Sequence, residues 1–523
     1  MYDIIIRNGT LIDGSGDPAR LGDVGIKGDR IAAIGELHDE RGEIEIDAEG
    51  KFVAPGFVDV NNHSDTYWQI FLDPDLESMV YQGVTTIVGG NCGSSLAPLA
   101  EAKNIESIQK WTDLSKVNVN WLSLAEFFQF MSGKNLSLNF ATMAGHGTLR
   151  RGILRDEMRS PNPKELAFIN NKLVGALQDG ALGMSTGLIY THARMATLDE
   201  LVDLARTVKK YDGIYTTHLR GEADELTDSI EEAIAVAEKS KVKLHVSHLK
   251  AVGAKNWSKM EEALAMLERL SQNGLDVTFD VYPYTNIGSV LYTLLPPWVS
   301  EGGKKMMLGR LKDPVIRAKI ISEMRSSIFE YEKIEIASSG LDKTLTRRKI
   351  TEIAGSQGKS IEDAIIDILI ASDGRVITSA EVLSETNIRN ELRSSLSIVA
   401  SNGSGYSAKH SQTGEVVHPR SFGAFIKVLS QYVVSEEVLG WEEAIRKMTS
   451  LPAEKFGIVG RGRLAKNYFA DVVILDRDKL ASPATKDNPY QYSRGVEYLF
   501  VNGNIVVKEG EYQGVRKGRI IKR

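Results

Sequence analysis

The sequence predicts an α/β protein in which a (β/α)8 barrel, of the TIM type, carries a small composite β-sandwich domain. Three observations predict it. Both ends of the chain contain short strands divided by turn residues, the middle alternates apolar strands with helical patterns, and eight candidate strands lie in that middle part. An open parallel sheet is the runner-up for the same pattern. The chain has 523 residues, of which 42% are hydrophobic, so it is long enough to form several domains.

The two ends are expected to share one β-domain. Near the start, Tyr2 to Arg7 is rich in β-branched residues and is followed by turn residues, as in an antiparallel meander. Near the far end, the run Val496 to Val501 precedes Asn502-Gly503, which is a strong two-residue hairpin signal. Neither end has enough strands to close a sandwich alone. Residues 1–54 and 456–523 are therefore predicted to form one composite domain.

Residues 55–455 are predicted to form the barrel. Helical patterns such as Leu198 to Lys210, with apolar residues three and four positions apart, separate the candidate strands. The strands are Phe52 to Val60, Thr85 to Val88, Leu138 to Ala144, Leu182 to Thr186, Ile214 to Thr217, Leu244 to Ser247, Val277 to Val281 and Ser397 to Ser401. The interval after the seventh strand is far longer than the ~2 to 6 residues of an ordinary connection. We expect a small inserted domain over residues 288–350.

Composition and charge exclude several classes of protein. Lys and Arg number 63 against 69 Asp and Glu, and the net charge of −6 offers no basic surface for a polyanion. We therefore expect a small-molecule partner, neither nucleic acid nor membrane, and a homo-oligomer is possible. The start lacks the pattern of a secretory signal, which predicts a cytoplasmic protein. The single cysteine, Cys92, excludes an intrachain disulfide.

Reactive side chains gather at the carboxyl ends of the predicted strands, where barrel enzymes keep their active sites. Cys92 follows the second strand, His146 the third, His218 the fifth and His248 the sixth. A thiolate and neutral imidazoles are the ligands that zinc prefers. Cys92, His218 and His248 therefore form a candidate zinc site.

Each of these residues also has a simpler structural interpretation. A lone cysteine is most often a small buried hydrophobe, and a single histidine is more often a core or surface residue than a ligand. The glycines around Cys92 at a strand end, and the recurrence of histidine at equivalent strand ends, favour the metal site instead. His245 lies inside a strand, so it is interpreted as a packing residue or a donor to a ligand.

Several motifs spread over nearly the whole chain together resemble a known family. They are Pro55-Gly56-Phe57-Val58-Asp59, Gly83-Val84-Thr85-Thr86, Asn91-Cys92-Gly93, Gly145-His146-Gly147-Thr148, Thr217-His218-Leu219-Arg220, Ser247-His248-Leu249-Lys250 and His418-Pro419-Arg420. This set is similar to the D-aminoacylase (N-acyl-D-amino-acid deacylase) branch of the amidohydrolase superfamily. The resemblance implies a zinc-dependent hydrolase that cleaves the amide of N-acyl-D-amino acids.

The resemblance also implies roles for individual residues. In this family a cysteine replaces the carbamylated lysine of other amidohydrolases, so the tightly held zinc would be bound by Cys92, His218 and His248. Three residues fall where the family holds the substrate carboxylate, and His146 is assigned to the substrate site as well. The carboxylate-binding residues implied in this way are Tyr190, Lys250 and Arg420.

Two departures from the family pattern bear on catalysis. The His-x-His of the first strand is Asn61-Asn62-His63 here, which leaves His63 as its only metal-ligating histidine. The aspartate that shuttles protons in the family is Asn402, and an amide is a poor zinc ligand and a poor base. We therefore expect one tightly held zinc and a second site that is weak or empty. Asp65 is the remaining candidate for proton transfer, although it can equally cap a helix at Thr66.

Three functions remain open at this point. The first is hydrolysis of linear N-acyl-D-amino acids. The second is a catalytically weak or inactive zinc-binding or ligand-binding relative, which the two asparagines would explain. The third is hydrolysis of cyclic amides of the hydantoin type. It is less favoured because those enzymes rely on the carbamylated lysine and on both histidines of the first strand.

Overall fold

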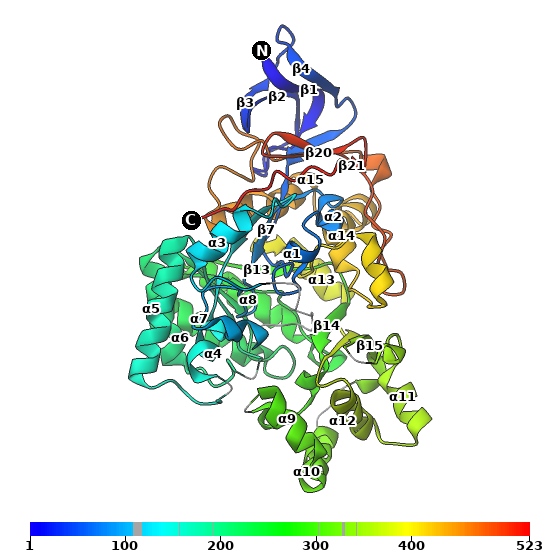
Figure 1. Cartoon of the computed structure of the whole chain (residues 1–523). Helices are drawn as coiled ribbons and strands as arrows, with labels where there is room; N and C mark the ends of the chain where they lie inside the picture. The colour runs from blue at the N-terminus through cyan, green and yellow to red at the C-terminus, as the bar shows by residue number, and fades with distance from the viewer. Residues whose placement is uncertain (108–117, 156, 191, 302, 327–329, 341) are drawn as a thin grey trace.

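In a computed structural model of the chain, the two ends meet in one nine-stranded sheet, which lies at the top of Figure 1. The structure describes residues 1–107, 118–155, 157–190, 192–301, 303–326, 330–340 and 342–523. The sheet order is β21-β20-β19-β18-β5-β1-β2-β3, with β4 paired to β1. Its strands are β1 (Tyr2–Leu11), β2 (Arg20–Lys27), β3 (Arg30–Gly35), β4 (Gly42–Asp47), β5 (Phe52–Pro55), β18 (Val472–Leu475), β19 (Val496–Val501), β20 (Asn504–Lys508) and β21 (Glu511–Tyr512).

Local sequence explains how this sheet forms. β19 and β20 are joined at Asn502 and Gly503, which both have positive φ (51° and 77°), as a tight hairpin turn requires. Ile4 and Ile6 of β1 belong to the same hydrophobic core as Phe500 of β19. Burial of such side chains from both ends stabilises the sheet, because removal of apolar surface from water is favourable.

The barrel is built from parallel strands. A three-stranded sheet has the order β6-β7-β8 and a six-stranded sheet the order β17-β13-β12-β11-β10-β9. β8 and β9 are interrupted only at Met143, and a parallel bridge between Asn62 and Gly403 joins the ends of the first and last strands. The strands are β6 (Phe57–Asp59), β7 (Val84–Gly89), β8 (Asn139–Thr142), β9 (Ala144–Gly145), β10 (Gly183–Gly187), β11 (Ile214–His218), β12 (Lys243–Val246), β13 (Val277–Val281) and β17 (Ser397–Val399).

The predicted strand Phe52 to Val60 is two strands in the structure. β5 belongs to the terminal sheet and β6 to the barrel, and Gly56 stands between them. A Cβ at Gly56 would lie 2.1 Å from a methyl carbon of Thr85, so a side chain does not fit there. The sequence does not indicate this break, because β5 and β6 are both buried and therefore both hydrophobic.

Helices cover the outside of the barrel, and α5 to α8 are seen at the left of Figure 1. In α6, the Thr197 side chain caps the first turn, and apolar residues three and four positions apart face inward. The helices around the barrel are α1 (Gln69–Leu72), α2 (Glu77–Val80), α3 (Leu124–Ser132), α4 (His146–Leu154), α5 (Pro163–Asp179), α6 (Leu198–Lys210), α7 (Leu226–Ser240), α8 (Lys259–Gln272), α13 (Glu385–Arg393), α14 (Arg420–Lys427), α15 (Trp441–Met448) and α16 (Ser450–Phe456).

A separate small lobe follows the seventh barrel strand, at the bottom of Figure 1. Its antiparallel sheet has the order β14-β16-β15, and β14 opens it while β16 completes it. The lobe therefore extends beyond the predicted range 288–350. Its elements are β14 (Asn286–Val290), α9 (Gly303–Lys312), α10 (Pro314–Ser326), β15 (Ile334–Ser339), α11 (Ile350–Gln357), α12 (Ile361–Ala371) and β16 (Val376–Glu381).

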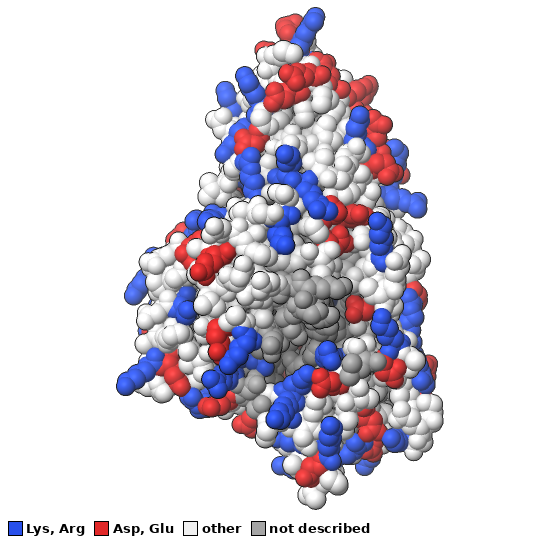
Figure 2. Space-filling view, viewed as in Figure 1, with Lys and Arg blue, Asp and Glu red and all other residues white. Residues whose placement is uncertain are grey.

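The surface carries charges of both signs. Figure 2 shows Lys and Arg interspersed with Asp and Glu on the face in view, in keeping with the net charge of −6. Within the described segments, every helix is too short or too polar to span a lipid bilayer.

Candidate active site

The three predicted zinc ligands lie together at the carboxyl ends of barrel strands. Cys92 follows β7, His218 ends β11 and His248 follows β12, and their ligand atoms all lie within 4.8 Å of one another. Cys92 Sγ is 3.4 Å from His248 Nε2. All three residues are buried, and His218 Nδ1 has no hydrogen-bond partner among the described residues. One buried cysteine and two buried histidines form a donor set that fits zinc. A ring nitrogen of His218 without a hydrogen-bond partner is free to be a ligand.

The backbone at this cluster adopts a conformation that L-residues rarely use. The φ angles of Cys92 and His248 are +52° and +38°, and that of Asn402 is +45°. Such strain is often found at functional sites, where surrounding packing holds it in place. Gly93 shows that packing, because a Cβ there would lie 2.7 Å from the backbone nitrogen of Gly187. The glycines that flank Cys92 in the sequence therefore let the loop approach the neighbouring strand.

The neighbours of Cys92 favour the thiolate form of its side chain. Burial alone would raise the pKa of its thiol, but the neighbouring histidines outweigh burial and hold that pKa well below its ordinary value. Burial lowers the pKa of His248, yet its contacts with Cys92 and Glu222 outweigh this and raise the pKa to about 9. The contact between Cys92 Sγ and His248 Nε2 therefore favours opposite charges on the two side chains. A metal ion bound to His248 Nε2 would displace its proton and would have the Cys92 thiolate as a second ligand.

Lys250 lies beside His248, one of the predicted zinc ligands. Its Nζ is 2.5 Å from Glu222 Oε1 and 2.8 Å from His248 Nδ1. Its ammonium is thus already paired, so its predicted contact with a substrate carboxylate remains a prediction. Glu222 escaped the sequence analysis, although it lies only four residues after His218. A carboxylate so close to a ligand in sequence was the signal that could have identified it.

The residues at the expected second metal position bind one another. Asn61 Nδ2 donates to both carboxylate oxygens of Asp280 at 3.2 Å, and Asp280 also contacts His245 Nε2 at 2.9 Å. Asn402 Oδ1 lies 2.9 Å from His63 Nε2. His63 Nε2 is in turn 4.0 Å from Cys92 Sγ, so Asn402 is connected to the metal cluster through His63.

A short chain of hydrogen bonds fixes the turn after the last barrel strand. The Gly403 N–H donates to Ser401 Oγ at 2.9 Å, and the Ser401 hydroxyl donates to Asp59 Oδ2 at 2.5 Å. Asp59 is fully buried, and burial raises the pKa of its carboxyl to about 6. Asn402 thus stands on a turn that the barrel core holds in place.

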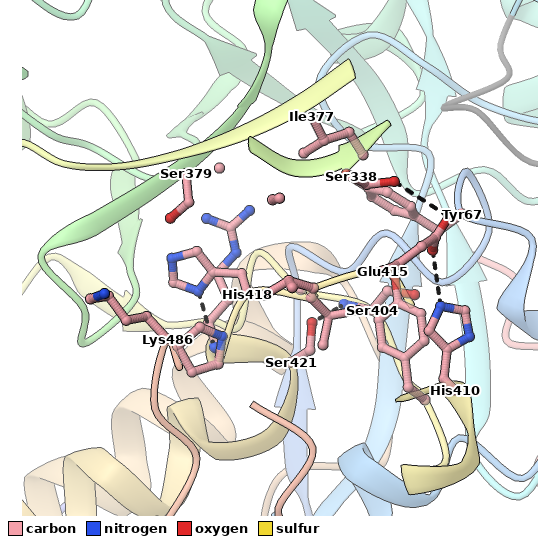
Figure 3. Close-up of a pocket in the computed structure, with 18 of the residues that line it drawn as sticks. Tyr67, Ser338, Ile377, Ser379, Ser404, His410, Glu415, His418, Ser421 and Lys486 are labelled. Carbon is pink, nitrogen blue, oxygen red and sulfur yellow. Dashed lines mark hydrogen bonds and ion pairs between the residues drawn. The ribbon is translucent and has the colours of Figure 1, made fainter. Parts of the chain in front are cut away.

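A cavity of about 300 Å³ opens beside Asn402, between the barrel and the small lobe. Figure 3 shows His418 and Ser404, from the segment after the last barrel strand, facing Ser338 and Ile377 of the lobe across this space. Arg420 lines the same cavity. The site is therefore built from two parts of the chain, the barrel and the lobe that follows β13.

Arg420 is a buried cation without an ionic partner in the part of the chain that the structure describes. Only 8% of the residue is exposed, and its Nε has no hydrogen-bond partner among the described residues. Within those residues no carboxylate lies within 4.0 Å of its guanidinium, whose carbon is 4.9 Å from the Tyr282 ring centre. Buried arginines are normally paired, so this guanidinium is available to an anion. Tyr282 was missed in the sequence, although it directly follows the seventh strand.

Tyr190 lies against the metal cluster. Its ring centre is 5.3 Å from that of His218, in an edge arrangement. Burial, and then the negative charge of Cys92, raise the pKa of its hydroxyl well above the ordinary value. Tyr190 is therefore protonated at neutral pH, so its hydroxyl can donate a hydrogen bond but is no base.

Asp65 and His146 make contacts of a structural kind. Asp65 accepts hydrogen bonds from the backbone N–H groups of Thr66 and Gly90, both at 2.7 Å, and so links the first strand end to the second. His146 starts α4, is fully buried, and contacts Glu200 Oε1 through Nε2 at 2.9 Å. These contacts do not cap a helix, because α1 begins at Gln69 and its N-cap position is Trp68. The predicted roles of Asp65 and His146 in catalysis and substrate binding stay predictions.

Comparison with known proteins places this geometry in context. Residues 45–302 and 416–507 match the model described as the amidohydrolase family. The chain is 31% identical to D-aminoacylase of Alcaligenes xylosoxydans xylosoxydans, over 100% of this chain and 98% of that protein. It is 33% identical to N-acyl-D-glutamate deacylase of the same organism, over 100% and 96%.

A solved structure has the same fold over its whole length. It is N-acyl-D-glutamate deacylase of Bordetella bronchiseptica, complexed with zinc and a phosphonate inhibitor that mimics the tetrahedral intermediate. The TM-score is 0.84, with 29% sequence identity and 100% of both chains covered.

Proposed function

We propose a reaction for this chain from the premise that it belongs to the amidohydrolase family: it hydrolyses the amide bond of N-acyl-D-amino acids. The products are a carboxylic acid and a free D-amino acid. The observation that carries this proposal is Arg420, a buried guanidinium that has no carboxylate partner among the described residues and lines the same cavity as Asn402. A linear N-acyl amino acid has a carboxylate to pair with it.

One zinc ion is proposed per chain, held by Cys92, His218 and His248. When bound, zinc would supply Lewis-acid chemistry, by polarising the amide carbonyl and lowering the pKa of water towards ~7. The second position lacks a comparable set. Asn61 already donates to Asp280, and a carboxamide is a weak metal ligand, so His63 alone is left for a second ion.

The chain's own residues would orient the substrate. Arg420 would form two parallel hydrogen bonds to the α-carboxylate, which fixes the position of the neighbouring amide. Tyr190 would donate a hydrogen bond close to His218, where negative charge develops on the carbonyl oxygen. Burial of the cluster excludes bulk water and strengthens these interactions.

Asn402 is expected to limit the rate of hydrolysis, because it stands where the family has an aspartate that transfers protons. Its side chain lies between the cavity and His63, so it can orient the attacking water by hydrogen bonding. An amide does not accept a proton at neutral pH, and general-base assistance typically contributes ~10²- to 10⁴-fold. We therefore propose a slow hydrolase. An inactive zinc-binding relative is the second candidate, because the same residue, Asn402, supports it.

The proposal is tested with a panel of N-acetyl-D-amino acids, their L-enantiomers and a cyclic hydantoin, each assayed with added zinc. Release of free D-amino acid that requires both zinc and Cys92 is expected. Turnover of the hydantoin but not of the linear substrates would contradict the proposal. Zinc binding without any turnover would favour the inactive relative. A cytoplasmic location, expected from the sequence, is a further part of this proposal.

A further inference from the structure

His418 joins the small lobe to the start of α14, the helix that begins at Arg420. Its Nδ1 accepts a hydrogen bond from the Arg420 N–H at 3.1 Å. Its Nε2 lies 3.0 Å from the backbone oxygen of Asn286, the first residue of β14. The two ring nitrogens thus contact two different parts of the chain. We propose that His418 is a positioning residue, which holds Arg420 in the orientation that receives the carboxylate of the substrate.

Both contacts of His418 require the same form of its imidazole. A backbone N–H only donates, so Nδ1 has to carry a lone pair, and a carbonyl oxygen only accepts, so Nε2 has to carry the proton. A neutral ring with its proton on Nε2 satisfies both contacts at once. Burial, and then the charge of Arg420, hold the pKa of His418 well below its ordinary value, so the ring is neutral at physiological pH.

The guanidinium of Arg420 is not fixed by ion pairs. Its Nε has no hydrogen-bond partner in the described ranges, and no carboxylate there lies within 4.0 Å of it. A side chain without such partners takes its orientation from its backbone and from the groups that pack against it. The Arg420 N–H is held by His418, and the Tyr282 ring centre lies 4.9 Å from the guanidinium carbon. The contact with His418 is therefore the hydrogen bond that fixes where the Arg420 side chain starts.

The small lobe lies on the other side of this contact. A Cβ built on Gly288 of β14 would be 3.7 Å from Arg420 Nη2 and 3.8 Å from His418 Cδ2, so β14 runs directly beside both side chains. The segment before His418 is also attached to the lobe, because the Val416 N–H donates to the backbone oxygen of Ala337 in β15 at 3.0 Å. His418 is thus anchored to two strands of the lobe. This inference rests on the proposed function, since it takes Arg420 as the residue that binds the substrate carboxylate.

The experiment compares the binding of a carboxylate with that of its uncharged amide. The probes are N-methanesulfonyl-D-alanine, in which a sulfonamide replaces the amide that would be hydrolysed, and its carboxamide. Titration calorimetry with the zinc-loaded protein gives both dissociation constants, and their ratio reports the contribution of the carboxylate. The variants are His418→Phe, Arg420→Ala, the double variant and the control His38→Phe. His38 is exposed, in the loop between β3 and β4. Circular dichroism establishes that each variant is folded.

The wild type should bind the acid ~10- to 100-fold more tightly than the amide, and Arg420→Ala should lose this preference. His418→Phe should reduce the preference by ~3- to 10-fold, as expected for the loss of neutral hydrogen bonds. It should have no further effect in the double variant, because His418 acts through Arg420. The control should match the wild type. A folded His418→Phe protein with the wild-type preference would overturn the inference, and so would a separate loss of the same size in the double variant.

Two further variants decide the matter if His418→Phe does not fold. His418→Asn can still accept from the N–H two residues ahead, as asparagine commonly does, and His418→Gln can still donate to the Asn286 oxygen. Each keeps one of the two contacts, so each should prefer the acid less strongly than the wild type does. The wild-type preference in both variants would overturn the inference. Equal binding of acid and amide by the wild type, or an undiminished preference in Arg420→Ala, would instead contradict the carboxylate contact of the proposed function.

Discussion

Asn402 Oδ1 lies 2.9 Å from His63 Nε2, so the side chain that replaces the family's aspartate is held by the surviving histidine of the first strand. The two asparagines that depart from the family pattern have different partners. One asparagine, Asn61, donates to Asp280, and the other accepts from His63. At the position expected for a second metal, Asn61 Nδ2 and Asn402 Oδ1 are thus already engaged with other groups of the protein.

The purified protein should retain one equivalent of zinc per chain after dialysis. Cys92→Ala should lose it, because two imidazoles alone are an incomplete ligand set. Elemental analysis measures the ratio. The φ of +52° at Cys92 also disfavours alanine, so a melting curve without metal is the control for folding. Two equivalents in the wild type, or full occupancy in the variant, would exclude this assignment.

Arg420→Ala should raise KM for an N-acyl-D-amino acid by one to two orders of magnitude. A charged hydrogen bond is worth ~1.5 to 3 kcal/mol, and the binding of the carboxylate is common to ground and transition states. Arg463→Ala is the control, since this surface arginine pairs with Glu454. Steady-state kinetics would refute the role of Arg420 if both variants kept the wild-type KM.

Asn402→Asp should increase kcat for deacylation. A carboxylate at this position, within ~3 Å of the attacking water, would restore general-base assistance worth some part of ~10²- to 10⁴-fold. Aspartate tolerates the φ of +45° found here, so little loss of stability is expected. A fall in kcat would show instead that another residue already transfers the proton, and Asp65→Asn would then be the next variant to assay.

The double variant Asn61→His, Asn402→Asp should bind a second metal ion. The change supplies a histidine and a carboxylate beside His63, and it removes the hydrogen bonds from Asn61 to Asp280. Elemental analysis at increasing zinc concentration should approach two equivalents. Each single variant is the control. A ratio that stays at one in the double variant would mean that more than these two residues block the site.

Asp59 should make stability depend on pH. Its pKa of about 6 in the folded protein exceeds the unfolded value of 3.8, so its contribution is complete below pH ~4 and is lost as pH rises through ~6. A shift of ~2 units corresponds to at most ~3 kcal/mol. Urea unfolding from pH 4 to 7 should therefore show Asp59→Asn gaining stability relative to the wild type. A difference that stays constant over this range would argue against the raised pKa.

Much of the barrel could be predicted because its strands are short, buried and bounded by glycines. The ends of those strands then brought Cys92, His218 and His248 together by topology alone. The small lobe was harder, since β14 pairs with β16 across four helices and local patterns do not encode such long-range pairing. Side-chain partners were hardest. The sequence separation between Lys250 and Glu222 does not indicate that the Lys250 ammonium donates a hydrogen bond to the Glu222 carboxylate.

The hydrogen bond from the Gly403 N–H to Ser401 Oγ also protects the chemical identity of Asn402. Asparagine followed by glycine is prone to deamidation, in which the glycine nitrogen attacks the side-chain carbonyl, ammonia leaves, and water opens the resulting ring to aspartate or isoaspartate. In the folded protein that nitrogen is occupied and the residue is buried. Unfolding exposes it.

Protein recovered from denaturant would thus carry some aspartate at position 402, which is the substitution that should accelerate catalysis. If the gain is ~10³-fold, about one converted molecule in a thousand would equal the activity of all the others. The fraction of Asn402 converted to aspartate therefore has to be known before a measured rate is assigned to the asparagine form. Mass spectrometry of the peptide around Asn402 measures this fraction.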